Sequence, residues 1–206
     1  WAFVPPEFLG AQAELFKDES SAFKQYGIDG DLRIQMVADN DGLIEPGEKV
    51  YLFFGMGRGG DVYYGLDVTD PLSPQLLWRR DSGSLPGVGQ TWSSPMPTRM
   101  NIAGAAQNAD KLVLVMGGGY EPDQDNSGLT TDIIGNSVYV IDSVTGNLLW
   151  HGSRDGIHKD FNILGKAMDY SIPGRIRVVD MDGDGFADRL YAGDMGGQVW
   201  RFDVNN

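Results

Sequence analysis

The sequence contains no cysteine and only two histidines, His151 and His158. The lack of cysteine excludes disulfides, thiolate-ligated zinc and thiol catalysis. Neither histidine stands in a zinc-binding spacing, and no nucleophile motif accompanies them, so a hydrolytic triad cannot be assembled. We therefore expect a protein that is not an enzyme, and we expect both histidines at the surface because the stretch around them is polar.

Positive charge is also scarce, with 16 Lys and Arg against 29 Asp and Glu and a net charge of −13. This balance argues against a surface that binds nucleic acid through its phosphates. No apolar run approaches the ~18 residues of a membrane span. The opening residues, WAFVPPEFLG, lack the basic start and apolar core of a signal peptide, as expected of a fragment or a processed form.

What the chain does contain is a repeat, and its three copies follow one plan. In each copy an apolar run leads through a glycine-rich turn into a second apolar run, the pattern of a β-hairpin. A leading strand precedes each hairpin, and a strand with the letters Leu-Leu-Trp follows the first two. The hairpins read EKVYLFFGMGRGGDVYYGLDV (48–68), DKLVLVMGGG with GNSVYVIDSV (110–119 and 135–144), and DRLYAGDMGGQVWRFDV (188–204).

Four antiparallel strands repeated in this way predict the blades of an all-β propeller. The expected blades cover about 31–81, 91–152 and 170–206, after a helical lead-in over 1–30. The whole chain, 1–206, is then part of one propeller domain. Three blades cannot close a ring, so we expect part of a larger, modified propeller.

One short N-terminal helix is expected within 5–21, where Phe8, Leu15 and Phe16 form a partial apolar face. The letters GMGRGG, residues 55–60, match a dinucleotide fingerprint, but that fingerprint requires a following helix. A strand pattern follows instead, so we interpret these glycines as a hairpin turn.

The strongest candidate for a functional site is the acidic loop DMDGDGFAD, which joins the first two predicted strands of the third blade. Its spacing follows the ligand order of an EF-hand calcium loop up to position nine, although the glutamate of position twelve is absent. Oxygen donors of this kind select a hard cation of calcium size. The alternatives are magnesium or an empty turn, because Asp and Gly also form turns. The predicted Ca²⁺ ligands are Asp180, Asp182, Asp184, the carbonyl of Phe186 and Asp188.

The corresponding loop of the first blade, residues 37–48, is acidic as well. Val37 stands where the first ligand would be, so the loop predicts either a weak second metal site or a solvated acidic turn. The candidate ligands of that second site are Asp39, Asp41, Glu45 and Glu48.

Several segments resemble the C-terminal propeller of the PilY/PilC family, proteins associated with the tip of bacterial type IV pili. They are WAFVPPEFLG, YGIDGDLRI, VYLFFGMGRGGDVYYGLDVTDP, TWSSPMP, VYVIDSVTGNLLW and DMDGDGFADRLYAGDMGGQVWRFDV. The resemblance implies export to the cell surface, a place at the pilus tip, and a role in pilus assembly, twitching motility and adhesion.

The resemblance also implies a Ca²⁺ site in the loop of residues 180–188 that tunes pilus extension against retraction. The implied partners are pilus components such as minor pilins, and host or abiotic surfaces reached through other regions. Two other functions remain open from the residues alone. A quinoprotein dehydrogenase propeller would need a quinone pocket at its centre, and an integrin-like surface module would need several aspartate loops.

Overall fold

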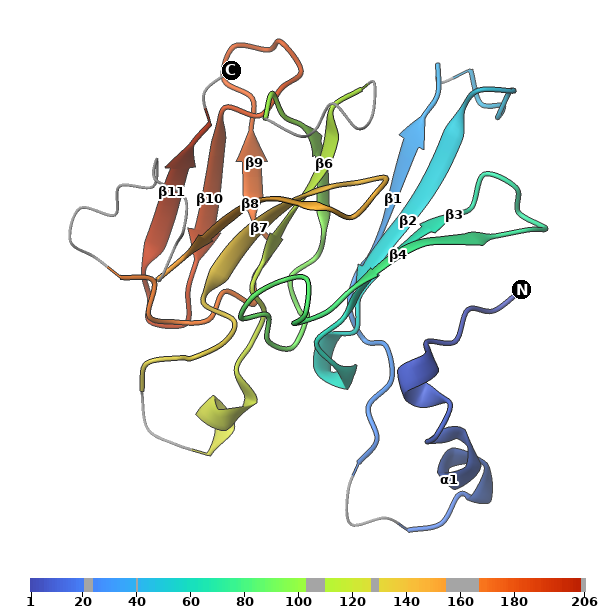
Figure 1. Cartoon of the computed structure of the whole chain (residues 1–206), viewed down its shortest axis with the longest axis vertical. Helices are drawn as coiled ribbons and strands as arrows, with labels where there is room; N and C mark the ends of the chain where they lie inside the picture. Colours follow the sequence, from blue (N-terminus) through green and yellow to red (C-terminus); the bar gives the residue numbers. More distant parts are fainter. Residues whose placement is uncertain (21–23, 40, 103–109, 127–129, 155–166, 205–206) are drawn as a thin grey trace.

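The computed structural model describes residues 1–20, 24–39, 41–102, 110–126, 130–154 and 167–204. In these ranges the chain forms three antiparallel sheets that lie side by side (Figure 1). The first sheet consists of β1 (Leu32–Val37), β2 (Lys49–Gly55), β3 (Tyr63–Asp67) and β4 (Gln75–Arg80); the second of β5 (Met96–Arg99), β6 (Leu112–Gly117), β7 (Ser137–Asp142) and β8 (Leu148–Ser153); the third of β9 (Arg177–Val179), β10 (Arg189–Gly193) and β11 (Val199–Asp203).

Each sheet pairs its strands in chain order, as the hairpin pattern predicts. In the first sheet, β2 ends at Gly55, a 3-10 turn covers Gly57–Gly59, and β3 follows. The glycine cluster is therefore a hairpin turn, and the prediction that a strand and not a helix comes next is confirmed. The third sheet has β9 at one edge and β11 at the other.

The core lies between the sheets, because alternate residues of a strand face opposite sides. In β6, Leu114 packs toward the first sheet with Phe53 and Trp78. Its neighbour Val113 packs toward the third sheet with Leu190. The second sheet is thus buried on both faces, which explains why β6 and β7 are apolar nearly throughout.

The far face of the first sheet is covered only in part. Phe3 and Phe8 of the lead-in pack there on Phe54 and Tyr64, and Phe3 meets the Tyr64 ring edge-on at 5.3 Å. Ile34 of β1, on the same face, remains 66% exposed.

The predicted N-terminal helix is present, but its predicted apolar face is wrong. The chain forms a 3-10 turn over Pro6–Phe8 and then α1 over Gln12–Lys17. Phe8 packs on the first sheet, whereas Leu15 is 62% and Phe16 92% exposed. The lead-in is docked through Phe3 and Phe8, whereas α1 buries none of its residues. No helix in the described residues has the length and hydropathy to cross a membrane.

Glu7 anchors the lead-in to the first sheet, which gives a testable prediction. Its carboxylate accepts a hydrogen bond from the Tyr64 hydroxyl at 2.6 Å and one from Arg79 Nε at 2.8 Å. Burial opposes the charge, but the hydrogen bonds from Tyr64 and Arg79 prevail and hold the pKa of Glu7 below its usual value. Burial and the neighbouring Glu7 raise the pKa of Tyr64 to about 12.

We expect Glu7→Gln to lower the free energy of unfolding by about 0.5–1 kcal/mol at pH 7, since the pair is partly exposed. Because the folded pKa of Glu7 lies below its unfolded value, its contribution is present above the unfolded pKa and is lost as pH falls through the folded one. Urea unfolding at neutral and acidic pH measures both effects. Glu14→Gln, whose partner Lys17 lies 3.7 Å away at the surface, is the control. An equal loss of unfolding free energy in the two variants would contradict the role of Glu7 as an anchor of the lead-in.

Candidate metal centre

The acidic loop runs from the end of β9 to the start of β10 and lies at one end of the molecule (Figure 1). Its first turn winds around one side chain: Asp180 accepts the N–H of Gly183 at 2.7 Å and that of Gly185 at 2.9 Å. Both glycines have positive φ, 83° and 89°, which L-residues with a side chain rarely adopt. The alternation of Asp and Gly therefore shapes the loop as well as supplying charge.

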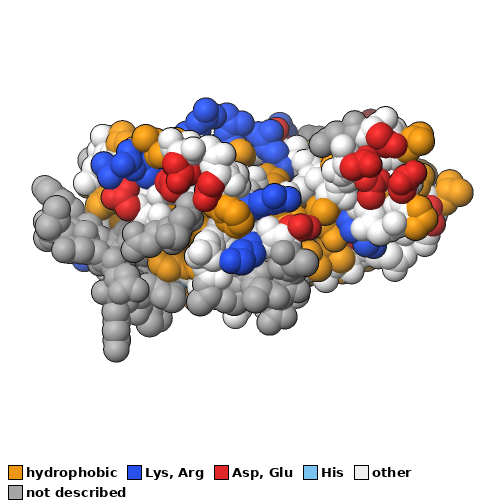
Figure 2. All heavy atoms as spheres, turned by 90° about the horizontal axis from the view of Figure 1, so that it is seen from above, with side chains coloured by type: hydrophobic (Ala, Val, Ile, Leu, Met, Phe, Trp, Pro, Cys, Tyr) orange, Lys and Arg blue, Asp and Glu red, His pale blue; other side chains and the backbone are white. Residues whose placement is uncertain are grey.

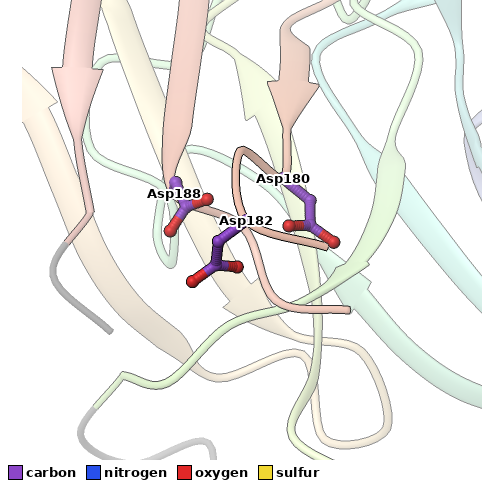
Figure 3. Close-up of side chains that lie close together, drawn as sticks. All are labelled: Asp180, Asp182 and Asp188. Carbon is purple, nitrogen blue, oxygen red and sulfur yellow. The ribbon is translucent and has the colours of Figure 1, made fainter. Parts of the chain in front are cut away.

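Three of the four aspartates come together. Asp180, Asp182 and Asp188 each place a carboxylate oxygen within 4.8 Å of the others. Figure 3 shows that they come from the end of β9, from the loop itself and from the start of β10. The third of them is tied into the sheet: the Asp188 N–H donates to the Val179 carbonyl at 3.0 Å, and its carboxylate accepts the N–H of Met181.

The fourth predicted carboxylate, Asp184, lies outside this group. Its Oδ1 accepts the N–H of Phe186 at 2.7 Å, two residues further on. Asp184 thus closes a local turn here, and the three gathered carboxylates are Asp180, Asp182 and Asp188. Phe186, the residue predicted to offer its carbonyl, follows within the same loop, and its ring lies 5.9 Å below Lys111 Nζ.

The electrostatics of the loop favour a bound cation. The N–H groups of Gly185 and Gly183 lower the pKa of Asp180, so this carboxyl stays charged. Three carboxylates at this separation repel one another. Their donor atoms are all oxygen, the set that calcium and magnesium prefer over zinc or copper. The residues present therefore fit a hard divalent cation.

The acidic loop of the first sheet has a different internal geometry. The Glu48 carboxylate accepts two backbone N–H groups, those of Asp39 and Glu45, both at 2.8 Å. Asp41 accepts the N–H of Leu43 at 2.8 Å. These carboxylates hold the turn together, and in the described part of the chain the structure gathers metal-ligand atoms only in the loop after β9.

Figure 2 looks onto the end of the molecule that carries both loops. It shows acidic side chains gathered on the left and on the right, with Lys and Arg side chains and further acidic atoms between the two groups. The loops after β1 and after β9 are therefore two distinct acidic regions.

The structure also contains a polar cavity that the sequence did not indicate. It has a volume of about 550 Å³ and is lined by Asp132, Asn136, Ser137 and His151 among others. His151 is buried, lies 3.1 Å from the Ser137 hydroxyl and stacks on the Tyr139 ring. The prediction of a surface position is wrong for His151, because β8 pairs with β7 and places the imidazole against Tyr139 of that strand. His158 lies outside the described residues.

Radially arranged antiparallel sheets, with an aspartate loop between the first two strands of one of them, define this chain as a β-propeller with a candidate cation loop. The chain belongs to the PilY1 β-propeller domain family, whose model matches residues 15–206. Both the expected fold class and the resemblance to the pilus-associated family are confirmed.

Curated relatives agree with this assignment. The type IV pilus biogenesis factor PilY1 of Pseudomonas aeruginosa is 30% identical over 165 residues, 80% of this chain. A PilY1 homologue of Xylella fastidiosa is 30% identical over 208 residues, 100% of this chain. The chain spans only 12% and 14% of the lengths of these two relatives.

A solved structure has the same fold. The crystal structure of the Pseudomonas aeruginosa PilY1 C-terminal domain matches with a TM-score of 0.63 and 24% identity. The match covers 99% of this chain and 34% of that one. At this identity the likeness supports the propeller architecture alone.

Proposed function

We propose that this chain is a calcium-binding, non-enzymatic β-propeller module of a type IV pilus biogenesis protein. The observation that carries the proposal is the gathering of Asp180, Asp182 and Asp188 within 4.8 Å, in a loop whose first turn is held by the N–H groups of two glycines on Asp180. Family membership supplies the pilus context, because the curated relatives are named as type IV pilus biogenesis factors.

In this proposal the module works outside the cell with pilus components, at the surface or the pilus tip. Binding and loss of the ion would shift the balance between pilus extension and retraction, and with it twitching motility. Attachment to host or abiotic surfaces is assigned to other parts of the longer protein, because the chain spans 12–14% of its curated relatives.

The ion is proposed to be calcium and not magnesium. Calcium accepts six to eight oxygens at flexible distances of ~2.3–2.6 Å, whereas magnesium demands near-octahedral geometry and dehydrates reluctantly. A short loop of three exposed or half-exposed carboxylates and its own carbonyls suits the more permissive ion. The Asp180, Asp182 and Asp188 carboxylates would hold the ion, with Phe186 as the candidate carbonyl donor.

Calorimetric titration of the chelator-treated chain tests the proposal. We expect one calcium per chain and a much weaker response to magnesium. Calcium at a hundredfold excess over its dissociation constant should stabilise the fold by ~2.7 kcal/mol, because it binds only the folded loop. Absence of calcium heat, together with an unfolding temperature that calcium does not change, would mean that the aspartates form an empty turn.

A further inference from the structure

The two halves of the acidic loop have different neighbours. The first half, around Asp180, is held by bonds within the loop. The second half of the loop packs against the second sheet. Ala187 is 1% exposed and belongs to the core cluster that joins the second and third sheets. Its N–H donates to the carbonyl of Arg99, at the end of β5, at 2.9 Å.

Lys111, just before β6, reaches the same half of the loop. Its ammonium lies over the Phe186 ring, 5.9 Å from the ring centroid. The ammonium is also held by a residue that follows β5 of the second sheet, because Nζ donates to Asn101 Oδ1 at 2.6 Å. The backbone is fixed as well, since the Met100 N–H donates to the Lys111 carbonyl at 3.2 Å.

The backbone of Lys111 is in an unfavourable region. Its φ is 51°, and among the described residues only Asp18 shares a positive φ without being glycine. Glycine would adopt this conformation without strain, and asparagine at a small cost. A turn needing only this backbone would thus be served better by either residue. What lysine adds is its side-chain contacts, the hydrogen bond to Asn101 and the position of the ammonium over the Phe186 ring.

We propose that Lys111 is a positioning residue of the ion site: from the second sheet it holds the Phe186 end of the loop in place and thereby raises calcium affinity. The proposal rests on the calcium site proposed above. Ala187 and Arg99 fix the backbone beside Phe186, and the lysine fixes its ring, so the loop requires less ordering when the ion binds.

The charge of Lys111 has an opposite effect, because a cation near the loop repels calcium. At ~0.15 M salt, where the Debye length is ~8 Å, this repulsion between groups at the surface is weakened by screening. We therefore expect the positioning effect to prevail under those conditions. The two effects differ in sign, so a single affinity measurement distinguishes them.

The experiment is calcium titration by calorimetry at 0.15 M salt on the chelator-treated chain and its variants. Lys111→Gly should bind calcium about twofold to fivefold more weakly, the loss that corresponds to an exposed cation–π contact. Lys111→Arg, which keeps a cation over the ring, should bind as the wild type does. Phe186→Leu should weaken calcium binding as much as Lys111→Gly does. The double variant should bind no more weakly than either single variant, since both changes remove the same contact between Lys111 and Phe186.

Two further measurements separate positioning from a general loss of stability. In chelator, Lys111→Gly should unfold at the wild-type temperature or above it, because glycine relieves the positive φ. Lys24→Gly is the matched control, as it removes a cation 5.1 Å from the Tyr26 ring, in the lead-in away from the loop. Its calcium affinity should be unchanged.

Unchanged or tighter binding by Lys111→Gly would overturn the proposal, as would losses that add up in the double variant. If the wild type binds calcium and Lys111→Gly binds it equally well, only the positioning role falls. If the wild type binds no calcium, the calcium site and the positioning role fall together.

Discussion

Replacing Asp180 by alanine is expected to weaken calcium binding about a hundredfold or more, because ligand charge and site rigidity both set the affinity of such loops. This side chain serves both: its carboxylate is one of the three gathered in the loop, and it accepts the N–H groups of Gly183 and Gly185. Asp180→Asn keeps an oxygen for those N–H groups and should bind with intermediate affinity. Calorimetric titration measures all three proteins.

The matched controls for Asp180→Ala are Asp184→Ala and Asp39→Ala. Sequence position alone puts Asp184 on a par with Asp180, but the structure turns its carboxylate onto the Phe186 N–H. We therefore expect a smaller loss for Asp184→Ala, and none for Asp39→Ala, whose carboxylate accepts the Asp41 N–H in the other acidic loop. A larger loss for Asp184→Ala than for Asp180→Ala would show that the loop rearranges around the ion.

Replacing Trp78 by alanine is expected to lower the free energy of unfolding by about 3–5 kcal/mol. The indole is 3% exposed, stacks on Phe53 at 5.8 Å and donates its N–H to the Ser143 carbonyl at 2.9 Å. It joins the first sheet to the second, so its loss opens a cavity between two blades. Two glycines make room for it: a Cβ at Gly65 or at Gly146 would lie 2.4 or 2.6 Å from the indole.

Urea unfolding followed by circular dichroism measures this loss. Trp1→Ala is the control, because the same side chain is 64% exposed at the start of the chain. It should change the free energy of unfolding by no more than about 0.5 kcal/mol. A similar small change for Trp78→Ala would contradict the interface between the first and second sheets.

The strands and their order could be predicted from the sequence because hairpins are local. An apolar run, a glycine turn and a second apolar run specify neighbouring antiparallel strands without reference to the rest of the fold. The hairpins at 48–68 and 188–204 are of this kind, and the structure forms β2–β3 and β10–β11 there. The candidate ion loop was likewise visible, since its spacing lies within nine residues.

What the sequence could not predict depends on contacts between distant residues. The sequence predicts that Leu15 and Phe16 pack because they are apolar, but the lead-in contacts the sheet through Phe3 and Phe8, and α1 stays exposed. His151 was expected at the surface, yet it stacks on Tyr139 of the adjacent strand. The contact of Lys111 with Phe186 joins two sheets across 75 positions of the chain, 186 − 111, and no local pattern signals it.

The most direct test of the central claim is a crystal structure of this chain grown with calcium. We predict a single ion after β9, bound by carboxylate oxygens of Asp180, Asp182 and Asp188 at ~2.3–2.6 Å. A well-ordered loop with no ion density at saturating calcium, and with Asp188 still accepting the Met181 N–H, would contradict it.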